Sequence, residues 1–289
     1  KAALAPFDTL LFKHLAYTFN RTARSFNYGI FGGPSDASAQ IDAFSRPFYK
    51  TINRFSANFA LTADLCLGLL AGDIKRKEML SGRLADIHAH LFIATAILKF
   101  YEKGQRSEVE QQHAQLALEK AFVQIQDAFD GLFANFPMRA AACVVKFICF
   151  PFGRVAQQPS DQLKTQLGRA IMENNPFREQ LKQHVFYNTD PNDVFGRMEN
   201  AFQAALKIDP LWTKFKKAES KGQFEGLDFE SHIQHALETG FINPEEADQL
   251  IHYNAQRFDS MLTDIFDHEL EQTLDLKNPY HTMGSDIQP

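Results

Sequence analysis

A helical spacing of apolar residues runs along almost the whole chain, and it constrains the fold more than any other feature. Within residues 39–70, apolar side chains recur at every fourth position: Ala57, Leu61, Leu65 and Leu69. Side chains four apart lie on one face of an α-helix, so this stripe predicts a helix with one buried side. The sequence shows no run of alternating strands and no repeat of fixed period. It therefore predicts an all-α fold.

The helices are predicted to form two groups: a helical bundle in residues 1–152 and a smaller acidic set of helices in 153–275, with a flexible tail in 276–289. The boundary is placed in FPFGRVAQQPSD (150–161), which holds two prolines and a glycine. The charge balance also changes sign there. Residues 1–154 carry 18 Lys and Arg against 13 Asp and Glu, and residues 155–289 carry 12 against 22. The basic half could face an anionic surface or partner, although a solvated charged surface is the simpler explanation.

Turn and cap residues predict where the helices begin. Asp73 is expected to cap the helix that follows the turn at 71–73, and Ser107 with Glu110 has the pattern of a capping box. Asn243 stands before a proline and two glutamates, which is a helix start. The stretch Leu84–Leu98 is apolar on nearly every face. We expect it at the centre of the bundle.

The residues that usually carry catalysis or bind metal do not form a recognisable set. GIFGG (29–33) lacks the lysine of a phosphate-binding loop and the spacing of a dinucleotide fingerprint. His232 and His235 could share a helix face, but the sequence offers no third ligand. The three cysteines lie in apolar helical runs, where thiols are usually buried. We predict no catalytic, cofactor-binding or metal-binding residue in this chain, and no nucleic-acid partner.

The most apolar tract, MRAAACVVKFICFPFGR (138–154), is too short to span a membrane. Only fourteen residues separate Arg139 from Arg154, with Lys146 among them, whereas a span needs about twenty. A core helix with a solvated basic edge and a helix lying in a membrane interface both fit this pattern. The candidate residues for contact with a membrane or a partner are the basic and aromatic ones: Arg139, Lys146, Phe147, Phe150, Phe152 and Arg154.

Three longer stretches resemble one known family. They are FDTLLFKHLAYTFNRTARSF (7–26), the segment 46–101 that contains SANFALTADLCLGLLAGDIKRKEMLSGRLADIHAHL, and FPFGRVAQQPSDQL (150–163). Together they are similar to the C-terminal part of the FadE-type long-chain acyl-CoA dehydrogenases of bacterial fatty-acid degradation, up to about residue 265. The middle stretch also resembles the extra C-terminal domain of the mitochondrial very-long-chain acyl-CoA dehydrogenase.

The resemblance implies an enzyme whose catalytic glutamate and FAD site lie upstream of this chain, so FAD is expected in the parent enzyme and no cofactor here. It also implies partners: the N-terminal catalytic part of the same enzyme, a second copy in a homodimer, an electron-transfer partner and the inner-membrane surface. The expected location is cytoplasmic and peripheral at the inner membrane. The alternative is a non-catalytic helical module that binds a membrane or partner, or an acyl- or lipid-binding protein.

Overall fold

The structure, a computed structural model, describes residues 4–35, 41–186 and 188–262, with side chains from Thr9 onward. These residues form ten α-helices, one 3-10 helix and no strand, which confirms the all-α prediction. The chain divides into two compact units, residues 1–177 and 178–289, named here the first and the second unit. The tail predicted for 276–289 lies outside the described residues.

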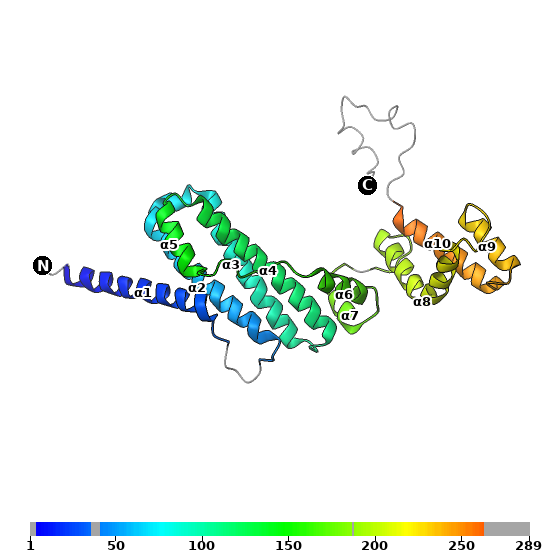
Figure 1. The fold of residues 1–289 in the computed structure, drawn as a ribbon, viewed down its shortest axis with the longest axis horizontal. Helices are drawn as coiled ribbons and strands as arrows, with labels where there is room; N and C mark the ends of the chain where they lie inside the picture. The colour runs from blue at the N-terminus through cyan, green and yellow to red at the C-terminus, as the bar shows by residue number, and fades with distance from the viewer. Residues whose placement is uncertain (1–3, 36–40, 187, 263–289) are drawn as a thin grey trace, which may run out of the picture. The chain divides into compact units, whose positions relative to one another are not determined.

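The first unit is a bundle of long helices, in which short connections join α2 to α3, through η1, and α3 to α4 (Figure 1). α2 packs against both α1 and α3, while α4 packs against α3, α5 and α6. α6 lies within this unit because it rests on α4, so the unit extends beyond the predicted boundary at residue 152. Its elements are α1 (Leu4–Phe31), α2 (Ser45–Leu70), the 3-10 helix η1 (Ala71–Lys75), α3 (Glu78–Lys103), α4 (Glu108–Asn135), α5 (Arg139–Cys149) and α6 (Asp161–Ile171).

Phenylalanine rings fill the centre of the first unit. Phe129 of α4 lies within 6.2 Å, centroid to centroid, of Phe55 of α2 and within 5.3 Å of Phe150, and all three side chains are buried. Each such ring removes a large apolar area from water. Part of the large phenylalanine content, 28 in the chain, is therefore used to build this core.

Helix α3 is buried on one side only, so Leu84–Leu98, predicted at the centre of the bundle, contributes just one face to the core. Ile87, Leu91 and Leu98 lie in the core, whereas Phe92 and Ile93 are exposed. The helix packs against α2 and α4, and no described residue covers its outward face. Uniform apolarity shows that a helix can be buried, but neighbouring elements decide which faces are covered.

The second unit has its own small aromatic core. Phe215, Phe224 and Leu250 are buried there, and Trp212 packs edge-on against Tyr253 with ring centroids 4.9 Å apart. One helix, α8, continues through Pro210, although we would expect a proline to end it. The helices beyond the first unit are α7 (Pro176–Lys182), which begins just before the division, α8 (Val194–Ser220), α9 (Phe229–Glu238) and α10 (Pro244–Met261).

Two of the three predicted helix starts are confirmed. Ser107 and Glu110 form the capping box of α4, and Asn243 caps α10 with the proline in its first turn. The prediction for Asp73 is wrong, because the chain continues into the 3-10 helix η1 and α3 begins only at Glu78. The side chain of Asp73 instead accepts a hydrogen bond from Arg76 at 2.6 Å.

Within the part of the chain that the structure describes, two helices could cross a bilayer by length and composition alone. They are α2 together with η1, and α3. Helices in the core of a soluble bundle satisfy the same criterion, and both helices contribute side chains to the core of the first unit. The tract 138–154 does not meet the criterion, in agreement with its predicted length.

Candidate interaction surface on α5 and α1

Helix α5 lies on the first unit with one narrow stripe facing inward. Ala142, Val145 and Cys149 are buried, at spacings of three and four residues, and the residues between them are exposed except for the half-buried Ile148. This is the period of a one-sided helix. The inner stripe belongs to the core, as the core-helix interpretation requires, and the outer side of the helix is open.

A buried polar cluster holds the C-terminal end of α5. The side-chain amide of Asn58 donates to the carbonyl oxygen of Cys149 at 3.1 Å, and the hydroxyl of Ser25 donates to Asn58 Oδ1 at 2.6 Å. The cluster thus joins α1, α2 and α5 and satisfies a carbonyl that the helix leaves free. Burial raises the pKa of the Cys149 thiol to about 11, so the thiol stays protonated near neutral pH and is no nucleophile.

The three predicted cations of the tract all have partners within the first unit. Lys146 lies 3.2 Å from Asp130, and Arg154 contacts both Asp130 and Asp127 at 2.7 Å. The hydrogen bond to Asp127 raises the pKa of Arg154. Arg139 donates to the last carbonyl oxygens of α4, those of Phe133 and Ala134. These cations therefore tie α5 and its following loop to α4, and their charge is partly balanced.

The three predicted phenylalanines separate into one core residue and two surface residues. Phe150 is buried among the rings of the core, so it is not available to a membrane or a partner. Phe147 and Phe152 are 61% and 78% exposed. Phe147 also contacts Phe26 of α1, with ring centroids 6.4 Å apart. The outer surface of α5 therefore continues onto α1.

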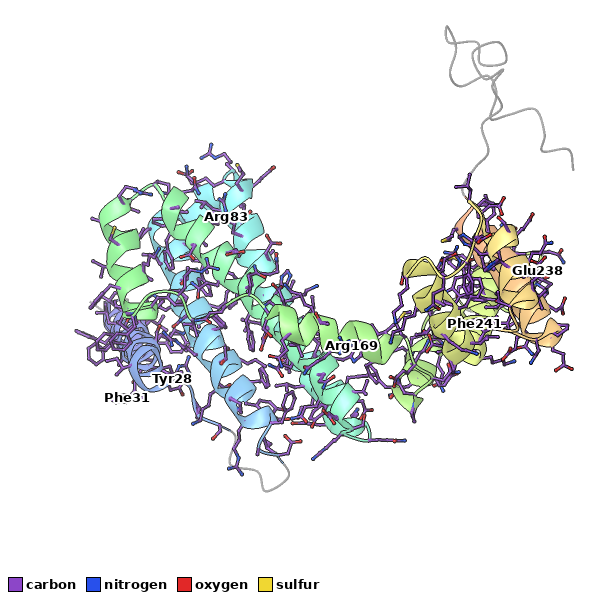
Figure 2. The ribbon with its side chains drawn as sticks, turned by 45° about the vertical axis from the view of Figure 1, so that its right-hand side comes forward. Tyr28, Phe31, Arg83, Arg169, Glu238 and Phe241 are labelled. Atoms are coloured by element: carbon purple, nitrogen blue, oxygen red, sulfur yellow. The ribbon has the colours of Figure 1, made fainter. Side chains whose placement is uncertain are left out.

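Helix α1 carries a second apolar surface that the sequence reasoning did not identify. Among its described side chains, 9–31, only Ser25 and Gly29 are buried. Its large apolar residues point outward instead: Leu10, Leu11, Phe12, Leu15, Tyr17, Phe19, Phe26, Ile30 and Phe31. Figure 2 views this helix nearly along its axis, and side chains radiate from it on several sides. The signal was present in the sequence, because the polar residues, and not the apolar ones, have the spacing of a buried stripe.

The described side chains form no metal cluster, and the two grooves described below have linings that do not suit a flavin. No group of three or more His, Cys, Asp or Glu is placed to hold a metal ion within the described ranges. An open groove of about 430 Å³ between α2, α4 and residues 155–160 carries Glu119 and several glutamines but no cation for a pyrophosphate. A second groove at the start of α3 has Arg76, Lys77 and Arg83 but no aromatic side chain to face a flavin ring. Neither groove fits FAD.

Comparison with known families decides the relationship. Residues 1–266 match the family described as "Acyl-CoA dehydrogenase, C-terminal, bacterial type". The chain belongs to this family. The resemblance deduced from the sequence is thereby confirmed over the same extent. No solved structure is detectably similar to the chain. A C-terminal domain of an acyl-CoA dehydrogenase belongs to an enzyme whose catalytic part is N-terminal to it in the same polypeptide.

Proposed function

We propose that this chain is the non-catalytic C-terminal domain of an FAD-dependent acyl-CoA dehydrogenase of fatty-acid β-oxidation. The enzyme would oxidise long-chain acyl-CoA to trans-2-enoyl-CoA, passing two electrons to the flavin and then to an electron-transfer partner. The observation that carries this proposal is the family match over residues 1–266.

An absorption spectrum tests this division of labour. We expect the full polypeptide, catalytic part and this domain together, to show a flavin band that bleaches when long-chain acyl-CoA is added. Residues 1–289 alone should show no such band after incubation with FAD. Flavin binding with acyl-CoA turnover by residues 1–289 alone would contradict the proposal, and so would a full polypeptide that neither binds flavin nor oxidises acyl-CoA.

For this domain itself we propose that it holds a homodimeric enzyme at the cytoplasmic side of the inner membrane. The outward side of α5 and its loop supports this role, since Phe147, Phe152 and Val144 are exposed there beside basic residues. Exposed phenylalanines next to cations suit the interface of an anionic bilayer. The ion pairs of Lys146 and Arg154 weaken the electrostatic part of this attraction, so the aromatic residues should matter more.

Co-sedimentation with phosphatidylglycerol vesicles tests the membrane role. We expect the double variant Phe147→Glu, Phe152→Glu to lose most vesicle binding while its circular dichroism stays unchanged, because both side chains are exposed. Phe92→Glu on α3, where the ring is 73% exposed, is the matched control and should bind like the unaltered chain. Equal vesicle binding by all three proteins would contradict the assignment of α5 as the membrane contact.

An acyl- or lipid-binding protein is the less favoured alternative. Such a protein needs a closed apolar cavity of the kind that encloses most of its ligand. The groove between α2 and α4 is open and is bordered by Gln115, Glu119, Gln157 and Gln158. A neutral acyl chain would leave these polar groups without water or partners.

A further inference from the structure

The first half of α1, residues 9–20, is inverted relative to an ordinary surface helix. Across α1 as a whole, the stripe that meets the rest of the unit is polar or small, and it consists of Thr18, Arg21, Thr22, Ser25 and Gly29. Ser25 bonds to Asn58, and Arg21 forms an ion pair with Asp64 of α2. Phe26 packs against Phe147 of α5, but the large apolar residues of the first half are all exposed. Since helices are normally held in place by apolar faces, this arrangement indicates that α1 has a partner beyond the first unit.

The exposed residues of this half occupy opposite faces of the helix. Leu10 and Phe12 are two residues apart, about 200° around the axis, and they are 67% and 68% exposed. Tyr17 and Phe19 repeat the pair seven residues later and are also exposed. A helix lying in a membrane interface has one apolar face and one charged face. Apolar residues on opposite faces are typical of a helix enclosed in a protein interior or crossing a membrane, and α1 does not meet the criterion of length and composition for a span.

The charges of α1 argue against a second copy of this chain as the protein that surrounds the helix. α1 contains Lys13, Arg21 and Arg24 but only one acid, Asp8. Arg21 is neutralised by Asp64, whereas Lys13 and Arg24 remain exposed beside the apolar surface. Two such helices packed together would bring like charges close to each other, which is unfavourable. The surface fits an apolar partner with an acidic rim.

The catalytic part is the partner that the family relationship supplies. In a C-terminal domain it precedes α1 in the same polypeptide, so it is tethered to this helix. A tether of this kind gives an effective concentration of the order of millimolar, far above that of a separate protein. A contiguous exposed apolar surface on a soluble protein usually marks an interface.

We propose that residues 9–20 of α1 dock into the catalytic part of the same polypeptide, with Leu10, Phe12 and Phe19 as the buried contacts. This inference rests on the proposed function, because it takes the preceding part to be the catalytic one. It separates two surfaces of the domain. The first half of α1 joins the domain to the enzyme, and the outer side of α5, next to Phe26, stays free for a membrane.

Hydrogen–deuterium exchange of the full polypeptide, compared with residues 1–289 alone, tests the docking. We expect the amides of residues 9–20 to exchange at least about tenfold more slowly in the full polypeptide, because docking protects them from local unfolding. The amides of α4 should exchange alike in both proteins and serve as the internal reference. Equal exchange of residues 9–20 in the two proteins would overturn the proposal.

Variants make the test specific. We expect the double variant Leu10→Glu, Phe12→Glu to restore fast exchange of residues 9–20 in the full polypeptide, while it leaves the stability of residues 1–289 alone unchanged. Phe92→Glu, a comparably exposed ring on α3, should leave the protection intact. Protection that survives the double variant would contradict the assignment of these side chains.

The other occupants of this surface give distinct results. If the protein of residues 1–289 alone has the mass of a dimer and its amides 9–20 exchange slowly, a second copy covers this surface, and the proposal is overturned. If amides 9–20 of this shorter protein exchange slowly only when phosphatidylglycerol vesicles are added, a lipid surface covers them, and the proposal is overturned as well. The flavin spectrum of the same full polypeptide keeps the two proposals apart. Protection without flavin refutes the proposed function alone, and flavin without protection refutes the docking alone.

Discussion

Helices α1 and α4 each contain 28 residues, yet they relate to the core in opposite ways. In α4, eleven residues are buried, and Phe129 and Leu132 are fully enclosed. In the described part of α1 only Ser25 and Gly29 are buried. α4 is held mainly by apolar packing, whereas α1 is held by a polar cluster, an ion pair and one aromatic contact, that of Phe26 with Phe147.

This difference in burial shows which interactions stabilise each helix within the domain. Removing apolar area from water stabilises α4 within this domain, at about 25 cal/mol for each Å². Hydrogen bonds of the kind that hold α1 contribute only about 0.5–1.5 kcal/mol each. The large apolar residues in the first half of α1 lie at the surface, so any burial of them comes from outside the first unit. The predictions below are arranged by the size of the effect that would break or sharpen this comparison.

The largest contrast should come from the same substitution in the two helices. We expect Phe129→Ala in α4 to lower the free energy of unfolding of residues 1–289 by about 3–5 kcal/mol, because it leaves a cavity among buried rings. Phe19→Ala in α1, where the ring is 75% exposed, should change it by less than about 0.5 kcal/mol. Urea unfolding followed by circular dichroism measures both. Equal losses would mean that α1 is packed within this chain.

The contribution of a polar contact to stability should depend on pH, whereas that of an apolar contact should not. In the second unit, Arg178 and Lys182 of α7 contact Glu199 of α8 at 2.8 and 3.2 Å. Burial alone would raise the pKa of Glu199, but the hydrogen bonds from Arg178, Gln203 and Lys182 outweigh it and hold this pKa at about 2 instead of an ordinary 4.5. The ionised group therefore stabilises the fold above pH 4.5, by up to about 3 kcal/mol, and this contribution is lost as the pH falls toward 2.

The variant Glu199→Gln should remove this pH dependence. We expect the unaltered chain to lose stability between pH 4.5 and 2 more steeply than the variant. The fluorescence of Trp212, the single tryptophan of the chain, reports unfolding of the second unit. Glu245→Gln, at an exposed acid in α10, is the control and should keep the steep loss. Identical pH profiles for the unaltered chain and Glu199→Gln would show that the Arg178 and Lys182 contacts do not stabilise the second unit.

The polar cluster that joins α1 to α2 and α5 should make an intermediate contribution to the free energy of unfolding. Asn58→Ala removes the main donor to the carbonyl of Cys149 and the acceptor of Ser25, both buried. We expect a loss of about 1–3 kcal/mol in the free energy of unfolding and faster amide exchange in α1. Ser56→Ala, an exposed position on the same helix, should have no such effect. Unchanged exchange in α1 would show that other contacts hold the helix.

The smallest predicted effect concerns the start of α4. Ser107→Ala removes the side chain that accepts from the backbone amide of Glu110, and we expect a loss of about 1 kcal/mol. Ser107→Gly should cost only a few tenths of that, since glycine is tolerated at a helix cap. Thermal unfolding of the three proteins gives the order. A loss for glycine as large as that for alanine would indicate a role for Ser107 beyond capping.

Much of the fold followed from local patterns. The helical period, the capping box at Ser107 and the cap at Asn243 depend on residues within a few positions of one another, so one sequence suffices to find them. The start of α3 did not follow from Asp73, because the chain forms a 3-10 turn before the helix begins. The limit of the first unit also depends on a distant contact, that of α6 with α4.

The candidate surface was predicted in part. The sequence indicated a basic and aromatic tract with an open side, and Phe147 and Phe152 are exposed as such a surface requires. It could not show that Phe150 turns into the core or that Lys146 and Arg154 meet acids of α4. These outcomes join residues that lie 16 or more positions apart, and no local pattern contains them.

The sequence by itself determined that this chain is helical, where several of its helices begin, and which family it belongs to. These properties depend on short-range hydrogen bonding, on the period of apolar residues and on extended similarity. Only the tertiary structure decided which faces are covered: it buries one side of α3, pairs the cations of the 138–154 tract, and leaves α1 with its apolar residues outward. Burial depends on which elements meet, and the period of a helix shows that it has a face without showing what lies against it.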